Sequence, residues 1–236
     1  FIFHYRSASR DTKKISPRFL VGSYRPKIAV YTANLGDYDD YQYQRPADGV
    51  DYILYADTNA VYDGIQCRRV SASDDPQRAA RKIKTLSQDV GDYEYTIWMD
   101  ANATLRCHPF QLIDLLGDAD FAALRHPQRS CTYDEARAVL RLRYDNEGIV
   151  NQQMARYKSD GFPTSYGLAE TRVVVRRNNA IVNRFNNDWH NEVVNGSRRD
   201  QLSCMYCLWR NNVNWRYLDN DLITVRRHAK PHWRAK

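Results

Sequence analysis

Long apolar runs are missing from this chain of 236 residues. No stretch approaches the roughly 18 consecutive apolar residues that mark a membrane-spanning helix, so we expect no part of it to cross a bilayer. No secretory signal peptide is visible. The chain starts at Phe1 rather than Met, and we expect it to be a piece of a longer protein.

Cysteine is scarce, and its spacing is that of neither a disulfide framework nor a zinc finger. The five cysteines are an odd number in a mid-sized chain. Cys204 and Cys207 form a C-x-x-C without a second pair, so we expect buried thiols rather than a metal or redox pair. A reducing compartment fits this usage, without excluding a secretory lumen. An aromatic RNA-binding signature is also absent, so we expect no nucleic-acid partner.

Positive charge and tyrosine are abundant. The formal net charge of +7 favours anionic partners such as nucleotide diphosphates, nucleic acid or the anionic face of a membrane. The 17 tyrosines and 5 tryptophans suit clefts whose walls stack on sugars or bases, and equally suit ordinary amphipathic packing.

Apolar runs and helical periodicities alternate along the first half of the chain, which indicates an α/β fold with a mainly parallel sheet flanked by helices. The second half is more helical. We expect strands at 27–33, 50–56, 65–70, 95–99, 121–124 and 171–176, and helices from Pro76, at 109–116, from Thr132 towards Tyr157 with an interruption at Gly148, at 179–194 and at 198–210. Capping boxes are expected at Thr132–Glu135 and at Ser197–Asp200.

The expected organisation is a peripheral basic lead-in over 1–26 and a single domain over 27–236. Within that domain we expect a nucleotide half at about 27–107 and an acceptor half at about 108–236. No internal repeat is evident.

The most informative segment is the one that follows the strand Tyr95–Met99. It places Asp100 at the carboxyl end of a buried strand, where α/β folds bind ligands, and Asn102 two positions later. On an extended backbone these two side chains point to the same side and could bind one cation or one diphosphate together. The same residue types also end strands by making turns.

Several separated motifs occur in a fixed order. They are KIAVYTANLGDY, VDYILYAD, ARKIK, YTIWMDANATL, HPQRSCTYDE, NQQMARYKSDG, GLAETRVVVR and RRDQLS. In this order, over roughly residues 27–210, the chain resembles the glycosyltransferase-like family that includes the plant mucilage-related proteins, long known only as a domain of unknown function.

The resemblance implies a GT-A-like fold, a Rossmann-type sheet that binds a nucleotide sugar. It places Asp100 at the position of a D-x-D motif, Arg81 and Lys84 near the diphosphate, and Glu170, Arg199, Asp200 and Gln201 in the sugar and acceptor pocket. Asn102 stands where a second carboxylate is usual, and Asn ligates through a carbonyl oxygen without charge. A Mn²⁺ or Mg²⁺ ion held by Asp100, Asn102 and a late histidine, His228 or His232, is the expected cofactor. For the two histidines a solvated basic tail is the alternative.

Further candidates lie at the ends of other strands. Thr32, Asn34 and Asp57 stand where the base and ribose bind in such sheets, and turn chemistry is the alternative for the last two. His126 and Arg129 follow a strand and could bind a sugar or an anionic acceptor. The catalytic candidates are Asp100, Glu170 and Asp200. Either Glu170 or Asp200 could act as a base, and a helix cap is the alternative role of Asp200.

The sequence thus predicts a glycosyltransferase that moves a sugar from a nucleotide-diphosphate donor to a glycan, polysaccharide or lipid-linked acceptor. A non-catalytic module that binds nucleotide sugars or carbohydrate is the alternative. The expected location is cytoplasmic or at a membrane periphery, or the Golgi lumen in a eukaryote.

Overall fold

The computed structural model describes residues 25–226 and contains a seven-stranded sheet in the order β3-β2-β1-β4-β7-β6-β8. Strands β5 and β9 form a separate two-stranded ribbon. The bounds are β1 Ile28–Asn34, β2 Asp51–Ala56, β3 Ile65–Arg69, β4 Tyr95–Met99, β5 Ala103–Leu105, β6 Phe121–Arg125, β7 Ala169–Arg177, β8 Trp215–Leu218 and β9 Ile223–Val225.

Within the large sheet every pairing is parallel except the two made by β7, which runs antiparallel to β4 and β6. The expected α/β class with a mainly parallel Rossmann-type sheet is therefore confirmed. Strand β1 is buried from Ile28 to Ala33, the pattern of a parallel strand covered on both faces. Each large apolar side chain buried there stabilises the fold by about 1.5–3 kcal/mol.

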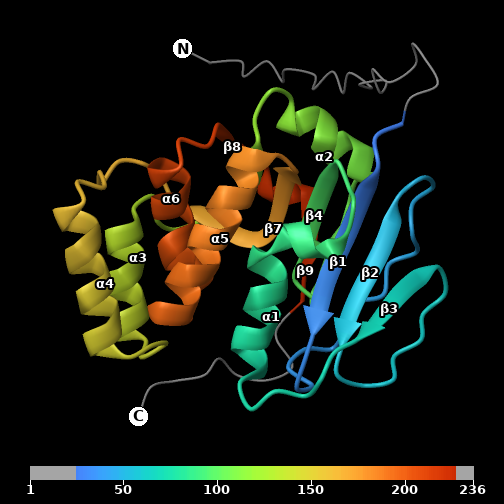
Figure 1. Cartoon of the computed structure of the whole chain (residues 1–236), viewed down its shortest axis with the longest axis horizontal. Helices are drawn as coiled ribbons and strands as arrows, with labels where there is room; N and C mark the ends of the chain where they lie inside the picture. The colour runs from blue at the N-terminus through green and yellow to red at the C-terminus, as the bar shows by residue number, and fades with distance from the viewer. Residues whose placement is uncertain (1–24, 227–236) are drawn as a thin grey trace, which may run out of the picture.

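Helices cover both faces of this sheet, as Figure 1 shows. The bounds are α1 Pro76–Thr85, α2 Pro109–Leu116, α3 Thr132–Arg141, α4 Glu147–Ser159, α5 Ala180–Asn195 and α6 Asp200–Arg210. Helices α1, α3, α4, α5 and α6 pack with one face of the sheet, and α2 packs with the other. None of the described helices is both long and apolar enough to cross a bilayer.

The long helix expected from Thr132 is two helices, and its predicted capping box is wrong. Helix α3 ends at Arg141, and Arg143 has a positive φ of 55°. Asn146 then caps α4 by accepting a hydrogen bond from the Ile149 amide, so Gly148 lies inside α4 and does not interrupt it. At the start of α3 no side chain caps the helix.

The second predicted capping box is also wrong, and its failure matters for the site. Helix α6 begins at Asp200 with no side-chain cap. The hydroxyl of Ser197 instead donates to Asp145 Oδ2 at 2.6 Å, which fixes the loop before α6. The Asp200 carboxylate is therefore left to other partners.

A bulge in β7 was not visible in the sequence. The register between β6 and β7 jumps from Ala123↔Val174 to Leu124↔Glu170. On its other edge β7 pairs regularly with β4 as far as Val173, and the Asp100 amide donates to the Arg172 carbonyl at 2.9 Å. Bulges bend a strand and redirect its side chains, often beside active sites.

Three short strands, β5, β8 and β9, were also missed. Strand β9 lies in the segment that we read as a basic tail. The predicted metal ligand His228, the alternative His232 and residues 1–24 of the lead-in lie outside the described residues. Cys204 and Cys207 are buried in α6 as free thiols, as expected. The division into nucleotide and acceptor halves stays a prediction.

Candidate functional site

A pocket of about 320 Å³ opens at one edge of the sheet. The carboxyl ends of β1, β4 and β6 and the amino end of antiparallel β7 meet there, and α1 and the start of α6 close the sides. Edges of this kind are where α/β sheets bind ligands.

Most of the residues predicted for the site line this pocket. They are Arg81, Lys84, Asp100, His126, Arg129, Glu170, Arg199, Asp200 and Gln201. Thr32, Asn34, Asp57 and Asn102 do not line it. The pocket places the first group together, while their chemical roles stay predictions.

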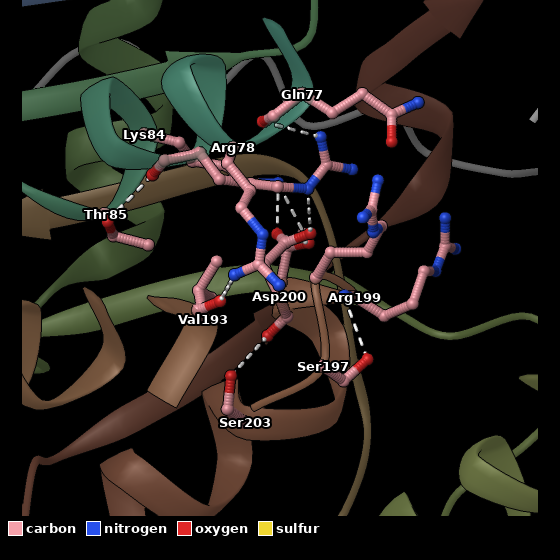
Figure 2. A network of polar contacts seen from close by, with 12 residues as sticks. Gln77, Arg78, Lys84, Thr85, Val193, Ser197, Arg199, Asp200 and Ser203 are labelled. Atoms are coloured by element: carbon pink, nitrogen blue, oxygen red, sulfur yellow. Dashed lines mark hydrogen bonds and ion pairs between the residues drawn. The ribbon is translucent and has the colours of Figure 1, made fainter. Parts of the chain in front are cut away.

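Asp200 is the centre of a buried charge cluster between α1 and α6, shown in Figure 2. Lys84 Nζ lies 2.6 Å from Asp200 Oδ2, and Arg81 Nε lies 3.4 Å from Oδ1. The Thr171 hydroxyl donates to Oδ2 at 2.8 Å and accepts from Lys84 Nζ at 3.0 Å. The spacing of Arg81 and Lys84 on α1 puts both on one helix face, which turns towards α6.

These partners fix the ionisation of Asp200. Burial by itself raises the pKa of this carboxyl, but the charges of Lys84 and Arg81 and the hydrogen bonds from Lys84 and Thr171 outweigh it. The pKa of Asp200 is therefore held well below its ordinary value. Such a carboxylate is a poor proton acceptor at neutral pH.

Asp100 stands at the end of β4, and its side chain is 26% exposed, facing the pocket. Its Oδ1 accepts a hydrogen bond from the Trp98 indole at 2.8 Å. Lys84 Nζ lies 3.7 Å from the same oxygen and 5.6 Å from the centre of the Trp98 ring. Lys84 thus stands between the two carboxylates, Asp100 and Asp200.

Glu170 is held far more loosely than Asp200. It forms one ion pair, with Arg172, whose side chain is 39% exposed and also lines the pocket. Burial raises the pKa of Glu170, and the nearby Asp100 charge adds to this effect against the opposing charges of Arg172 and Lys84. A raised pKa suits Glu170 to accept a proton, and the choice of base between Glu170 and Asp200 stays a prediction.

His126, Arg129 and Glu135 form a second polar cluster on the far wall. Arg129 Nε lies 2.5 Å from Glu135 Oε2, and His126 Nε2 lies 3.5 Å from the same oxygen. The amides of Gln128 and Arg129 donate to His126 Nδ1, and Arg129 Nη2 lies 3.2 Å from Nε2. Burial lowers the pKa of His126, with the Arg129 charge in the same direction, despite Glu135.

Arg199 and Gln201 enter the pocket from the start of α6. The Arg199 guanidinium lies over the Tyr144 ring at 5.5 Å and makes no ion pair with another described residue. Gln201 Nε2 donates to the Ala169 carbonyl at 3.1 Å, which ties α6 to β7. Arg199 is therefore a cation that can receive an anionic ligand.

Asn34 and Asp57 shape a loop beside the pocket. Asn34 exchanges two hydrogen bonds with the Asp39 backbone, at 2.7 and 3.2 Å, and Asp57 Oδ2 accepts from the Gly36 amide at 2.8 Å. Gly36 has a φ of +64°, and a Cβ there would lie 2.6 Å from the Pro76 ring, so glycine lets the loop approach α1. Both side chains perform the turn chemistry that was their alternative reading.

Thr32 is also placed apart from the pocket. It is buried in β1, and its Oγ1 has no hydrogen-bond partner among the described residues. The roles of Thr32, Asn34 and Asp57 in donor binding stay predictions. The loop that the last two hold does reach the pocket, through Tyr38 and Asp39.

Asn102 departs from the expected geometry. The backbone turns at Ala101 and Asn102, so the two side chains of the D-x-N do not project together from an extended strand. Asn102 is buried, and its Nδ2 donates to the Arg226 carbonyl at 2.9 Å. It anchors the segment that follows β9.

The residues at 25–226 do not by themselves bring the predicted metal ligands together. Among residues 25–226 no three His, Cys, Asp or Glu side chains gather as a metal site. Asn102 is not at the pocket, and the Lys84 ammonium stands beside the one pocket carboxylate of the motif. His228, the third predicted ligand, lies outside the described range, so the predicted metal set stays a prediction and no chemical step is derived through it.

Sequence reasoning missed Thr171 and Arg172. Both line the pocket beside Glu170, so three consecutive residues of β7 face one site. A regular strand would send alternate side chains to opposite faces, and the bulge removes that alternation. Tyr38 and Trp98 were also missed, although Trp98 lies two residues before Asp100.

The chain is similar in sequence to a curated plant protein. A probable hexosyltransferase of Arabidopsis thaliana, MUCI70, is 31% identical over 121 residues. The match covers 46% of this chain and 21% of that protein, so the chain spans about a fifth of that relative's length. A solved structure of the WbbM bifunctional glycosyltransferase, without ligands, aligns over 84% of this chain and 40% of its own with a TM-score of 0.44 and 8% identity.

The sequence model described as "TOD1/MUCI70, glycosyltransferase-like domain" matches residues 72–222. The match runs from just before α1 to just before β9 and includes every pocket residue named above except Tyr38 and Asp39. The family expected from the ordered motifs is thereby confirmed. The chain belongs to the TOD1/MUCI70 glycosyltransferase-like domain family.

Proposed function

We propose that this chain is a glycosyltransferase that moves a sugar from a nucleotide-diphosphate donor to a hydroxyl of a glycan, polysaccharide or lipid-linked acceptor. One observation carries the proposal. The pocket joins a cationic corner, made by Arg81, Lys84 and Arg199, to two carboxylates at strand ends, Asp100 and Glu170. Membership of a glycosyltransferase-like family supports the same chemistry.

The cationic corner suits the diphosphate of the donor. When the sugar leaves, negative charge builds on the diphosphate, and fixed cations stabilise that charge. The corner needs little rearrangement, because Lys84 is held by both Asp200 and Thr171. We place the nucleoside towards the loop that carries Tyr38 and Asp39, which borders the same corner.

Glu170 is our candidate for the base. In the proposed step the oxygen of the acceptor hydroxyl forms a bond to the anomeric carbon. The bond from that carbon to the diphosphate breaks, and the diphosphate keeps the electron pair. The hydroxyl proton passes to the Glu170 carboxylate, which its raised pKa favours. The Arg172 guanidinium neutralises the same carboxylate before transfer.

The wall formed by His126, Arg129 and Tyr144 is our candidate for the acceptor side. It offers an imidazole N–H, a guanidinium and an aromatic ring, groups that bind sugar hydroxyls and stack on sugar rings. The Arg129 guanidinium also suits an acceptor that carries phosphate.

One observation favours a second candidate function. Asn102 stands in the position of a metal-binding carboxylate and is engaged with the Arg226 backbone instead. A transferase that has lost its chemistry would bind the donor through the same pocket without turning it over.

A screen of nucleotide sugars tests the proposal. The chain is heated with UDP-, GDP- and CMP-sugars, with and without Mn²⁺, and the melting temperature is followed. A ligand present at 100 times its Kd stabilises the native state by about 2.7 kcal/mol. We expect one donor class to raise the melting temperature, and that donor then to be hydrolysed or transferred.

Two variants complete this test. Asp100→Ala is expected to abolish transfer while the chain stays folded, because it removes the pocket carboxylate at the end of β4, which accepts a hydrogen bond from Trp98 and faces Lys84 at 3.7 Å. Asp92→Ala, an exposed carboxylate elsewhere, is the matched control. Binding without turnover would favour the non-catalytic module, and no shift with any donor would refute both candidates.

A further inference from the structure

The Lys84 ammonium occupies an oxygen-rich position of the kind that a divalent cation takes. Its Nζ lies 2.6 Å from an oxygen of Asp200, 3.0 Å from the Thr171 hydroxyl and 3.7 Å from an oxygen of Asp100. Two carboxylates and a hydroxyl are the hard oxygen ligands that Mg²⁺ prefers. The side chain of Lys84 is only 6% exposed, so its charge is fixed inside the protein.

One N–H of the Lys84 ammonium takes no part in the two short contacts, with Asp200 and Thr171. An ammonium group has three N–H donors. Asp200 and Thr171 take two of them at hydrogen-bond distance, whereas 3.7 Å to Asp100 is longer than a hydrogen bond. A phosphate oxygen that enters the pocket can take the third donor without breaking either short contact.

The surroundings work against a second cation at the same place. A divalent ion on Asp100 would lie close to the Lys84 ammonium and be repelled by it. Lys84 and Arg81 already balance the two carboxylates here, Asp200 and Asp100. Arg199 adds a cation that pairs with no described carboxylate.

We propose that Lys84 is the built-in cation of this site: with Arg81 and Arg199 it binds the diphosphate of the donor directly, and diphosphate binding requires no divalent metal. The inference rests on the proposed function, since it concerns how the same pocket holds the donor. Asp200 and Thr171 are positioning residues that hold the ammonium, and Asp100 faces its third donor.

Calorimetric titration with UDP and GDP tests the inference, once in EDTA and once in Mn²⁺. We expect the better nucleotide to bind with the same Kd, within about twofold, in both buffers. Lys84→Met is expected to weaken binding at least tenfold in both, and added Mn²⁺ is expected not to restore it. Lys82→Met, which removes an exposed lysine of the same helix, is the matched control and should keep the native Kd.

Further variants guard against a folding defect. Lys84→Met leaves Asp200 with Arg81 alone, so Lys84→Met/Asp200→Asn, which removes both buried charges, is measured beside it. For Asp100→Asn the two explanations predict opposite changes in nucleotide affinity. If Lys84 binds the phosphate, removing the neighbouring negative charge leaves binding in EDTA equal or tighter. If a metal on Asp100 binds the phosphate, the same change weakens binding in Mn²⁺.

The outcomes separate this inference from the proposed function. Binding that is at least tenfold weaker in EDTA and restored by Mn²⁺ overturns the role of Lys84 and leaves the transferase standing. Weaker binding by Asp100→Asn overturns it in the same way. If neither nucleotide binds in either buffer, the proposed function fails and the inference fails with it.

Discussion

Asp200 and Glu170 are two carboxylates in one pocket with opposite electrostatic environments. Asp200, at the start of α6, is buried against Lys84 and Arg81, which hold its pKa below the ordinary value. Glu170, at the bulge of β7, has one partly exposed partner, and burial raises its pKa. Pairs of acids whose pKa values are pushed apart are typical of acid–base sites.

The difference lies in what each carboxylate can still do. Asp200 has an ion pair or hydrogen bond on both oxygens, so its charge stabilises the α1–α6 junction and fixes Lys84. Glu170 lines the same pocket, and a single ion pair leaves it able to accept a proton. We therefore assign stability to the first acid and chemistry to the second, and three variants test this division.

Glu170→Gln is expected to have the largest effect. Loss of a general base typically lowers the rate by about 10²–10⁴-fold. The native rate should rise with pH through a pKa above the ordinary 4.5 of glutamate, because the base works in its ionised form. The variant should lose that limb of the profile. The measurement is kcat against pH with the donor found in the screen.

Glu147→Gln, an exposed glutamate at the start of α4, is the control for this prediction. It should keep both the rate and the pH profile. If Glu170→Gln stays within a few-fold of the native rate and keeps the acid limb, the base lies elsewhere and the division fails.

Asp200→Ala is expected mainly to lower the free energy of unfolding. Removing one partner of a buried ion pair typically costs about 3–5 kcal/mol, because the other charge stays buried and unpaired. Here Lys84 would be left with the more distant Asp100. Urea unfolding at pH 7 measures the loss, and Asp118→Ala, whose side chain is 84% exposed, is the control with an expected loss of about 0–1 kcal/mol.

The pH dependence of that loss sharpens the comparison. The folded-state pKa of Asp200 is lowered, so its contribution is complete above the ordinary value of 3.8 and is lost as the pH falls below it. The stability difference between native chain and variant should therefore shrink towards pH 3. A difference that is the same at pH 7 and pH 3 would contradict an ionised Asp200.

The sequence predicts the regular elements of this fold well, since these follow from local patterns. The bounds of β4 and α2 are those expected, because an apolar run and a Pro–Gly-bounded periodic segment specify them. The helix break was expected at Gly148 and lies near Arg143 instead, because a non-glycine residue with a positive φ ends this segment. The ribbon of β5 and β9 was missed because three-residue strands carry almost no periodic signal.

The site was predictable in part for the same reason. Strand ends and the face of α1 follow from local periodicity, so the residues that line the pocket could be named. Which of them are engaged elsewhere could not. Asp57 and Asp100 are both acids after strands, yet the first bonds to the Gly36 amide and the second faces the pocket. Whether such an acid holds a loop or faces the pocket depends on how distant segments pack, which local patterns do not show.

Thr171→Val is expected to have the smallest effect and tests the bulge itself. The change removes the hydrogen bonds that Thr171 makes with Asp200 and Lys84 and keeps the shape of the side chain. We expect a loss of about 1–2 kcal/mol in urea unfolding, because the hydrogen bonds of a buried charged pair are left unmade. Thr224→Val, on the exposed side of β9, should change stability by at most about 0.5 kcal/mol. A regular β7 would instead turn residue 171 towards the apolar face that packs against α2. Valine would then be neutral or stabilising. That result would show that Thr171 does not make these hydrogen bonds and does not position Lys84.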